Sequence, residues 1–165
     1  MTGAGSFEEF YIGAVSRLLG QLFLVTGDLH EAEEVVQEAF ARASVRWSWL
    51  RDYNAPEAWV RRVAMNLAAD HARKLRRQAR AILRMEPPPE APEVSVETLA
   101  LVQALRTLPM RQRQAIVLYH LVGLPVEEVA QTMRVPAGTV KSLLSRGRRA
   151  LAARLGEAEE VQYRP

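Results

Sequence analysis

The polar side chains of this 165-residue chain that could do chemistry are mostly arginines, amides and small hydroxyls. The chain has no cysteine, which excludes disulfides, thiolate metal sites and cysteine nucleophiles. The three histidines, His30, His71 and His120, do not have the spacing of metal ligands, so we expect neither a metal nor a cofactor. The sequence also contains no nucleophile–base pair and no glycine-rich phosphate loop, and it does not predict an enzyme.

One group of these polar side chains shares a face of a helix that is predicted to begin at Pro56. With about 100° of rotation per residue, the group falls in one narrow sector, and it consists of Arg62, Asn66, Arg73, Arg77 and Arg80. Cations that only keep a helix soluble are normally interleaved with acids, whereas here only Glu57 and Asp70 interrupt. The pattern predicts a nucleic-acid face, in which the arginines bind phosphates and Asn66 pairs with a base edge.

A second group lies on a helix predicted over residues 137–155. Its polar face has hydroxyls and cations but no acid, and it consists of Thr139, Lys141, Ser142, Ser145, Arg146 and Arg149. In a major groove, hydroxyls can contact base edges while cations bind phosphates. A short helix predicted over residues 125–133 and a tight turn at residues 134–136 come before it. Together these segments predict a DNA-binding helix-turn-helix.

The elements that must position both groups are all predicted to be helices. Apolar residues recur with a helical period over residues 7–25, from Asp28 to Ala43, and over residues 96–108 and 110–122. The predicted core stripe of the second helix is Ala32, Val35, Val36, Ala39, Phe40 and Ala43. That of the helix beginning at Pro56 is Trp59, Val60, Val63, Ala64, Leu67 and Leu75. Residues 46–55 are predicted to form a loop, in which the roles of Trp47 and Trp49 stay open.

A proline-rich, acidic segment divides the chain. Residues 85–96 hold four prolines, and each lacks the N–H that a helix needs. The sequence therefore predicts an all-α protein with two helical domains joined by a linker. The expected boundaries are residues 1–84 for the first domain, 85–96 for the linker, 97–158 for the second domain and 159–165 for an acidic tail.

The net charge of +3 is distributed in blocks of opposite sign. Residues 46–85 carry ten basic and three acidic side chains, and residues 106–154 carry nine basic and two acidic ones. Two concentrated basic blocks favour a polyanionic partner. No apolar run approaches the roughly 20 residues of a membrane span, and the first residues lack the pattern of a signal peptide. We therefore expect a soluble, cytoplasmic protein with no membrane partner.

Long stretches of the chain resemble bacterial RNA polymerase sigma factors. AEEVVQEAFARASVRW (residues 32–47) and APEAWVRRVAMNLAADHARKLRR (residues 55–77) are similar to sigma region 2. LPMRQRQAIVLYHLVGLPVEEVAQTMRVPAGTVKSLLSRGRRAL (residues 108–151) is similar to region 4. The two-domain form resembles the extracytoplasmic-function group, and the TGD and VRRVAMNLA patterns resemble its SigE-like actinobacterial subgroup.

This resemblance implies a non-enzymatic transcription initiation factor that brings core RNA polymerase to particular promoters and helps to open them. Region 2 would bind the β′ clamp helices through Glu34, Gln37, Glu38 and Arg42. It would bind and melt the minus-ten element through Trp49, Asn54, Arg62, Asn66, Arg73, Arg77 and Arg80. Region 4 would contact the β flap and read the minus-thirty-five element through Thr139, Lys141, Ser142, Ser145, Arg146 and Arg149. The resemblance also allows an anti-sigma protein as a partner.

Two positions depart from the family pattern. Arg134 stands in the helix-turn-helix turn where glycine is usual, and a positive φ there would be unfavourable for arginine. Leu124 and Pro125 replace the usual Ser or Thr cap before the first helix of the motif. The alternative to a sigma factor is a free-standing helix-turn-helix regulator, which would bind duplex DNA without polymerase and would leave the basic face of residues 62–80 without a purpose.

Overall fold

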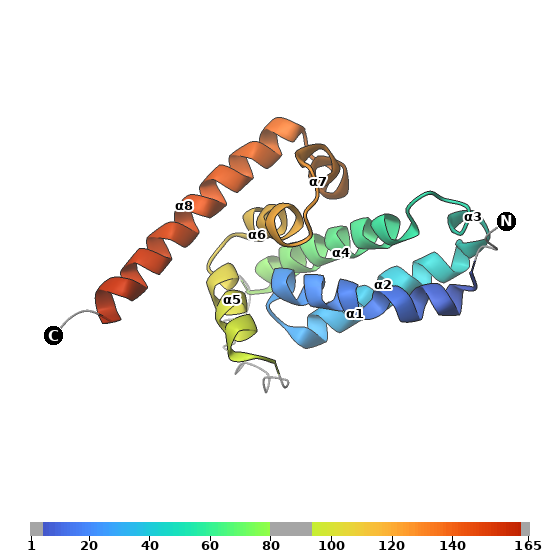
Figure 1. The fold of residues 1–165 in the computed structure, drawn as a ribbon, viewed down its shortest axis with the longest axis horizontal. Helices are drawn as coiled ribbons and strands as arrows, with labels where there is room; N and C mark the ends of the chain where they lie inside the picture. The colour runs from blue at the N-terminus through green and yellow to red at the C-terminus, as the bar shows by residue number, and fades with distance from the viewer. Residues whose placement is uncertain (1–4, 80–93, 163–165) are drawn as a thin grey trace. The chain divides into compact units, whose positions relative to one another are not determined.

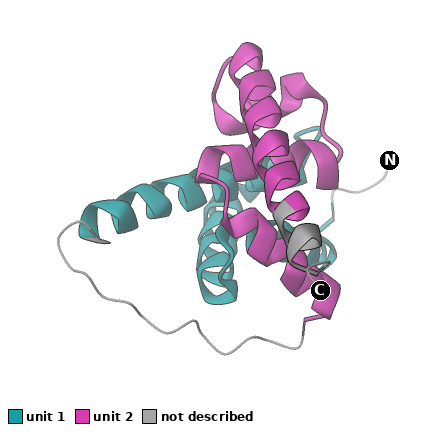
Figure 2. Ribbon diagram, turned by 90° about the vertical axis from the view of Figure 1, so that its left-hand side faces the viewer, with its two compact units in different colours: residues 1–92 teal, residues 93–165 magenta. Residues whose placement is uncertain are grey.

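The computed structural model describes residues 5–79 and 94–162, and it confirms an all-α protein over those residues. The chain divides into two compact units, residues 1–92 and 93–165 (Figure 2). Each unit consists of packed helices, and no strand occurs in the described ranges. None of the helices in these ranges is long and apolar enough to cross a membrane.

Unit 1 contains α1 (Phe7–Thr26), α2 (Leu29–Val45), the short α3 (Trp47–Leu50) and α4 (Pro56–Ala79) (Figure 1). Local sequence signals fix where the first two helices begin and end. The Ser6 hydroxyl accepts a hydrogen bond from the Glu9 N–H, and the Glu9 carboxylate accepts one from the Ser6 N–H, which forms a capping box. Gly27, with φ of 72°, ends α1, and the Asp28 side chain caps α2 by accepting from the Glu31 N–H.

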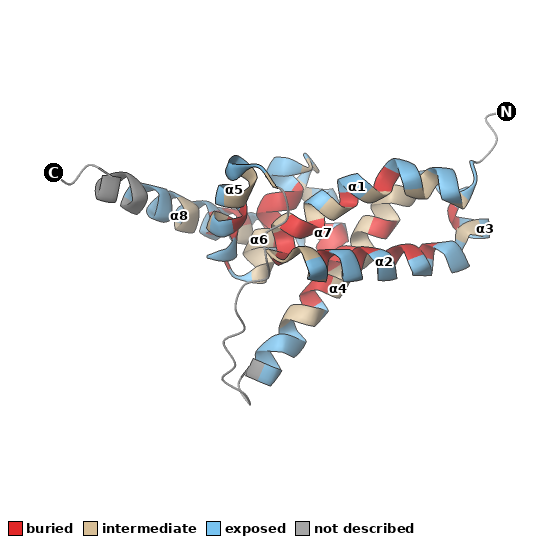
Figure 3. Cartoon of the chain, turned by 90° about the horizontal axis from the view of Figure 1, so that it is seen from below, coloured by how far each residue is buried: buried red, intermediate tan, exposed pale blue. Residues whose placement is uncertain are grey.

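The core of unit 1 lies where α1, α2 and α4 pack together. The predicted stripe of α2 is confirmed, since its six residues are all buried. The predicted stripe of α4 is partly wrong: Val60 and Ala64 are buried, but Trp59, Val63 and Leu67 are half-buried and Leu75 is 54% exposed. The stripe also missed the buried residues Met65, Ala68 and Ala69. Leu75 is exposed because the 24-residue α4 is longer than the 17-residue α2 that it packs on, and its C-terminal turns extend from the bundle (Figure 3).

Unit 2 contains α5 (Val96–Arg106), α6 (Met110–Ile116), the π-helical segment η1 (Val117–Leu121), α7 (Val126–Met133) and α8 (Ala137–Gln162). The helix predicted over residues 110–122 thus changes its hydrogen-bond pattern at Val117, because the Val122 N–H bonds to the Val117 carbonyl at 2.9 Å. Large buried side chains from four helices form the core of this unit: Leu105, Leu118, Met133 and Leu144.

Candidate nucleic-acid interface

The predicted helix-turn-helix is formed by α7 and α8. Two hydrogen bonds close α7 in a Schellman motif, from the Val135 N–H to the Ala130 carbonyl at 3.1 Å and from the Arg134 N–H to the Gln131 carbonyl at 3.4 Å. Arg134 has φ of 56° and ψ of 47°, which confirms the left-handed conformation considered for this turn. Pro125 caps the start of α7 without a side-chain hydrogen bond, as its sequence implied.

The polar face of α8 is open to solvent. Its six predicted DNA-contacting residues are all exposed, whereas Val140, Leu144 and Gly147 on the other side are buried. Within the described parts of the chain, no hydrogen bond or ion pair engages the side chains of this face: Thr139, Lys141, Ser142, Ser145, Arg146 and Arg149. A row of unengaged cations and hydroxyls on an acid-free helix face can bind a phosphate backbone and base edges without breaking contacts of the fold.

The polar face of α4 is more deeply embedded. Arg62 and Asn66 are half-buried, and the Asn66 Nδ2 donates to the Arg62 carbonyl at 2.7 Å. Arg73 is exposed and paired with Asp70, and Arg77 is exposed. Arg80 lies outside the described residues. The structure thus brings one amide and one guanidinium against the bundle and leaves two further arginines in solvent along the same helix.

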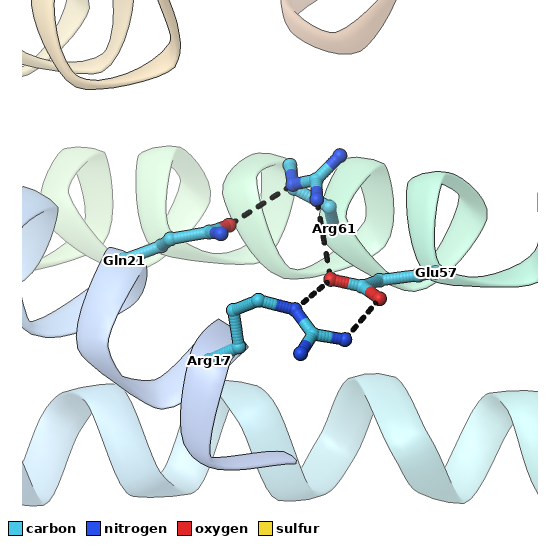
Figure 4. Close-up of polar contacts among 4 residues, drawn as sticks. All are labelled: Arg17, Gln21, Glu57 and Arg61. Atoms are coloured by element: carbon cyan, nitrogen blue, oxygen red, sulfur yellow. Dashed lines mark hydrogen bonds and ion pairs between the residues drawn. The ribbon is translucent and has the colours of Figure 1, made fainter. Parts of the chain in front are cut away.

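A polar network fixes the start of α4 against α1 (Figure 4). Arg17 of α1 donates to the Glu57 carboxylate through Nε at 2.9 Å and Nη2 at 2.6 Å. Arg61, whose side chain is only 11% exposed, contacts the same carboxylate at 3.4 Å and donates from Nε to the Gln21 Oε1 at 2.9 Å. Arg62 follows directly in the sequence, so this network sets the orientation of the helix that presents Arg62 and Asn66.

The network makes the stability of unit 1 dependent on pH. Hydrogen bonds from Arg17 lower the pKa of Glu57, partial burial opposes them, and the charge of Arg17 adds to the lowering. A lowered folded-state pKa contributes stability that is complete above the unfolded pKa of about 4.3 and is lost as the pH falls through the folded pKa.

We therefore expect Glu57→Gln to destabilise unit 1 by about 1 kcal/mol at pH 7, because the amide keeps the shape of the carboxylate but loses its charge. The difference between wild type and variant should shrink as the pH falls below about 4.3 and be lost once the pH is below the folded-state pKa of Glu57. Urea unfolding at several pH values measures it, with the exposed Glu33→Gln as a matched control that should leave the curve unchanged. A deficit that persisted at acid pH would contradict the role given to the charge.

The two tryptophans in the segment between α2 and α4 have different environments. Trp47 stacks on Phe10 with ring centroids 5.0 Å apart, so it belongs to the packing of unit 1. Trp49 is 57% exposed, and its ring lies 5.3 Å from that of Tyr53, which is also exposed. Asn54 is exposed nearby. Aromatic rings in solvent offer stacking surfaces for unpaired bases.

The polar face of α2 borders a groove that it shares with α4. Glu34, Gln37, Glu38 and Arg42 are exposed. Glu38 and Arg42 pair at 2.9 Å, and the Gln37 amide donates to the Tyr11 hydroxyl at 3.0 Å. All four predicted residues line this groove together with Leu67 and His71, and a second pocket that shares Glu34 and His71 continues along the same two helices. A groove with an apolar floor and a charged rim fits a helical partner.

Comparison with known proteins gives the same division of the chain. Sigma-70 region 2 matches residues 11–78, and Sigma-70 region 4 matches residues 98–151. The RNA polymerase sigma-E factor of Streptomyces coelicolor is 32% identical over 142 residues, which cover 85% of this chain and 80% of that protein. The chain belongs to the extracytoplasmic-function RNA polymerase sigma factors. This sigma factor is also 31% identical to the ECF RNA polymerase sigma factor SigW of Bacillus subtilis, over 81% of its own length and 80% of the relative's.

Solved structures of low sequence identity share the fold of this sigma factor. The sigma factor RpoE of Bartonella quintana, solved in complex with the anti-sigma factor NepR, superposes with a TM-score of 0.73 at 23% identity and covers 91% of this chain and 96% of its own. SigJ of Mycobacterium tuberculosis gives a TM-score of 0.62 at 24% identity, with coverage of 89% and 54%. None of these similarities supports the alternative of a free-standing regulator.

Two side chains at or near the interface of this sigma factor, Arg17 and Tyr53, are not predicted from the sequence. Arg17 lies 40 positions from its partner Glu57, and no periodic pattern links them. Tyr53 stood in a segment predicted to be a loop, which in fact contains α3. Gly147 is buried against Ile116, which agrees with its place on the apolar side of the helix predicted over residues 137–155, together with Val140 and Leu144.

Proposed function

We propose that this sigma factor reads the minus-thirty-five element of its promoters with the exposed face of α8 and opens the minus-ten element with α4 and the segment before it. The acid-free, unengaged face of α8 carries the first part of this proposal. Because Lys141, Arg146 and Arg149 have no partner in the described chain, they can neutralise phosphates without an internal cost. Thr139, Ser142 and Ser145 are exposed on the same face, and their hydroxyls can contact base edges.

Promoter opening rests on α4 and the segment between α2 and α4. A base extruded from a duplex costs a few kcal/mol, which stacking and nearby cations can offset. Trp49 offers an exposed ring and Asn54 an exposed amide. Arg62, Asn66, Arg73 and Arg77 would follow the melted strand along α4, and we extend this role to Arg80, beyond the described part of the helix.

The groove beside α2 supports the contact with core polymerase. We infer that Glu34, Gln37, Glu38 and Arg42 bind the β′ clamp helices, and that region 4 contacts the β flap. The Bartonella sigma factor of similar fold was solved in complex with an anti-sigma factor, and we propose a partner of that kind here as well. In this proposal the protein works in the cytoplasm, without a membrane partner and without catalysis of its own. Its domains follow the boundaries 1–84, 85–96, 97–158 and 159–165.

Two substitutions should separate the two recognition steps. Arg149→Ala removes a cation of α8 and should weaken binding to a minus-thirty-five duplex by about tenfold, roughly 1.4 kcal/mol. Asn66→Ala should leave that binding intact and reduce open-complex formation, because the amide that contacts the melted strand is lost. Gel shift with holoenzyme measures the first step and permanganate reactivity of unpaired thymines the second. Normal opening of a linear promoter by Asn66→Ala would refute the role given to the amide.

Run-off transcription tests the proposal as a whole. Core RNA polymerase is incubated with fragments of the source genome, with and without this protein. New discrete start sites should appear only when both are present, and aligning them supplies the two promoter elements. Tight, specific duplex binding by the protein alone, without new starts, would contradict the proposal.

A further inference from the structure

Arg134 occupies a backbone conformation that disfavours arginine. It is the single non-glycine residue with a positive φ among the described residues, and the two other residues with positive φ there are Gly27 and Gly123. Glycine adopts this left-handed region freely, whereas a side chain places its Cβ against the neighbouring carbonyl oxygen. Glycine would therefore make this turn more stable, and the arginine needs another explanation.

The fold does not supply that explanation. Arginine side chains at a helix end can cap its last carbonyls, but at the end of α7 the carbonyls of Ala130, Gln131 and Met133 are bonded by other groups. Val135 and Arg134 use their backbone N–H groups on Ala130 and Gln131, and Arg111 donates from Nη1 to the Met133 carbonyl at 3.1 Å. Within the described ranges, the Arg134 guanidinium makes no hydrogen bond or ion pair, and the residue is exposed.

The position of Arg134 points to an anionic partner outside the chain. It stands in the turn between α7 and α8, three residues before α8 begins, and it adds a fourth cation to Lys141, Arg146 and Arg149. In a docked helix-turn-helix, the first helix crosses the DNA backbone and the start of the second contacts base edges. The turn that joins them is therefore close to the phosphates at the edge of the groove.

We propose that Arg134 is a DNA phosphate contact, and that the protein keeps a conformationally unfavourable arginine in this turn because the guanidinium anchors the motif on the backbone of the duplex. The inference rests on the proposed reading of the minus-thirty-five element by α8. A guanidinium can donate two parallel hydrogen bonds to one phosphate, and its charge displaces a counterion. Such a contact fixes position and carries no base preference.

Three variants of the full chain, assembled with core polymerase, test the contact. Arg134→Gly removes both the charge and the strain. Arg134→Lys keeps the charge and the strain. Arg106→Ala removes the same charge from an exposed position on α5, which is not one of the two helices of the motif. The dissociation constant for a duplex with the minus-thirty-five element is measured over a range of salt concentrations, and hydrogen-exchange protection of the α7 and α8 amides is measured on the free proteins.

For Arg134→Gly we expect two opposite changes. The slope of the logarithm of the association constant against the logarithm of the salt concentration should become less steep by about 0.9. The affinity for the duplex should be lower by about fivefold at 0.15 M salt. Protection of the α7 and α8 amides should rise about fivefold, because the strain is relieved. Arg134→Lys should keep the wild-type slope and protection, and Arg106→Ala should keep the slope.

If the wild-type holoenzyme is specific for the minus-thirty-five element but Arg134→Gly leaves the salt slope unchanged, the phosphate contact alone is overturned. An equal change of slope in Arg106→Ala would also overturn it, since the effect would then come from net charge. A wild-type holoenzyme without preference for the element would overturn the proposed function and this contact together.

Discussion

Replacing Phe40 with alanine should destabilise unit 1 by about 4 kcal/mol. Phe40 is 2% exposed, and its ring centroid lies 4.9 Å from that of Tyr11 and 5.8 Å from that of Phe10. Phe7 joins the same cluster at 6.4 Å. Truncation would leave a cavity lined by rings, which are too rigid to close it. Native-state hydrogen exchange of the α2 amides measures the loss.

Ile12→Ala is a suitable control for Phe40→Ala. Ile12 lies on the same helix as Phe10 and Tyr11 but is 70% exposed, so its truncation should cost less than about 0.5 kcal/mol. Trp47, at the start of the segment that carries Trp49, also packs on this cluster through Phe10. Phe40→Ala should therefore lower promoter opening more than duplex binding. A loss of stability as small as that of Ile12→Ala would contradict the packing role of Phe40.

Replacing Gly147 with leucine should destabilise unit 2 by about 3 kcal/mol or more. A Cβ at this position would lie 3.0 Å from the Cγ1 and 3.2 Å from the Cδ1 of Ile116, and 3.6 Å from the Cβ of Gln112. Leucine would place three more carbons in the contact of α8 with α6. Hydrogen exchange of the α6 and α8 amides provides the measurement.

Two alanine variants are controls for Gly147→Leu. In Gly147→Ala, the gain in helix propensity of about 1 kcal/mol should offset the tight contact and leave stability nearly unchanged. A Cβ added at Gly138, also on α8, would meet no atom within 4 Å, so Gly138→Ala should stabilise the unit by up to about 1 kcal/mol. Stability of Gly147→Leu within about 1 kcal/mol of wild type would show that α6 and α8 do not pack as closely as described.

The elements that the sequence predicts well are those with a strong local signal. The stripe of α2 repeats an apolar period that places all its members on one face, and the structure buries all six. The tight turn after Met133 and the acid-free face of α8 are also local features, and they predict the helix-turn-helix. The six residues on that face are all exposed because the helical period places them on the same side of α8.

What the sequence does not predict depends on contacts between distant residues. Leu75 fits the period of α4 but lies on its C-terminal turns, where it lines an open pocket with the start of α2 and stays 54% exposed, and the period alone cannot show how far a partner helix covers it. The hydrogen bonds of Arg17 with Glu57 and the stacking of Trp47 on Phe10 join α1 to later parts of unit 1. The embedding of Arg62 and Asn66 has the same origin, since it depends on how α4 lies in the bundle.

The distribution of tryptophan gives this protein an intrinsic optical label. Trp47, Trp49 and Trp59 all lie in unit 1, and unit 2 has none, so tryptophan emission comes from one half of the molecule. Of these three indoles, Trp49 is the most open to a dissolved quencher such as iodide. A base stacked on Trp49 would shield it from iodide and quench its emission. Stacking of an unpaired base on Trp49 would thus be visible in the fluorescence of the unlabelled protein alone, while binding of a duplex by α8 would leave that fluorescence unchanged.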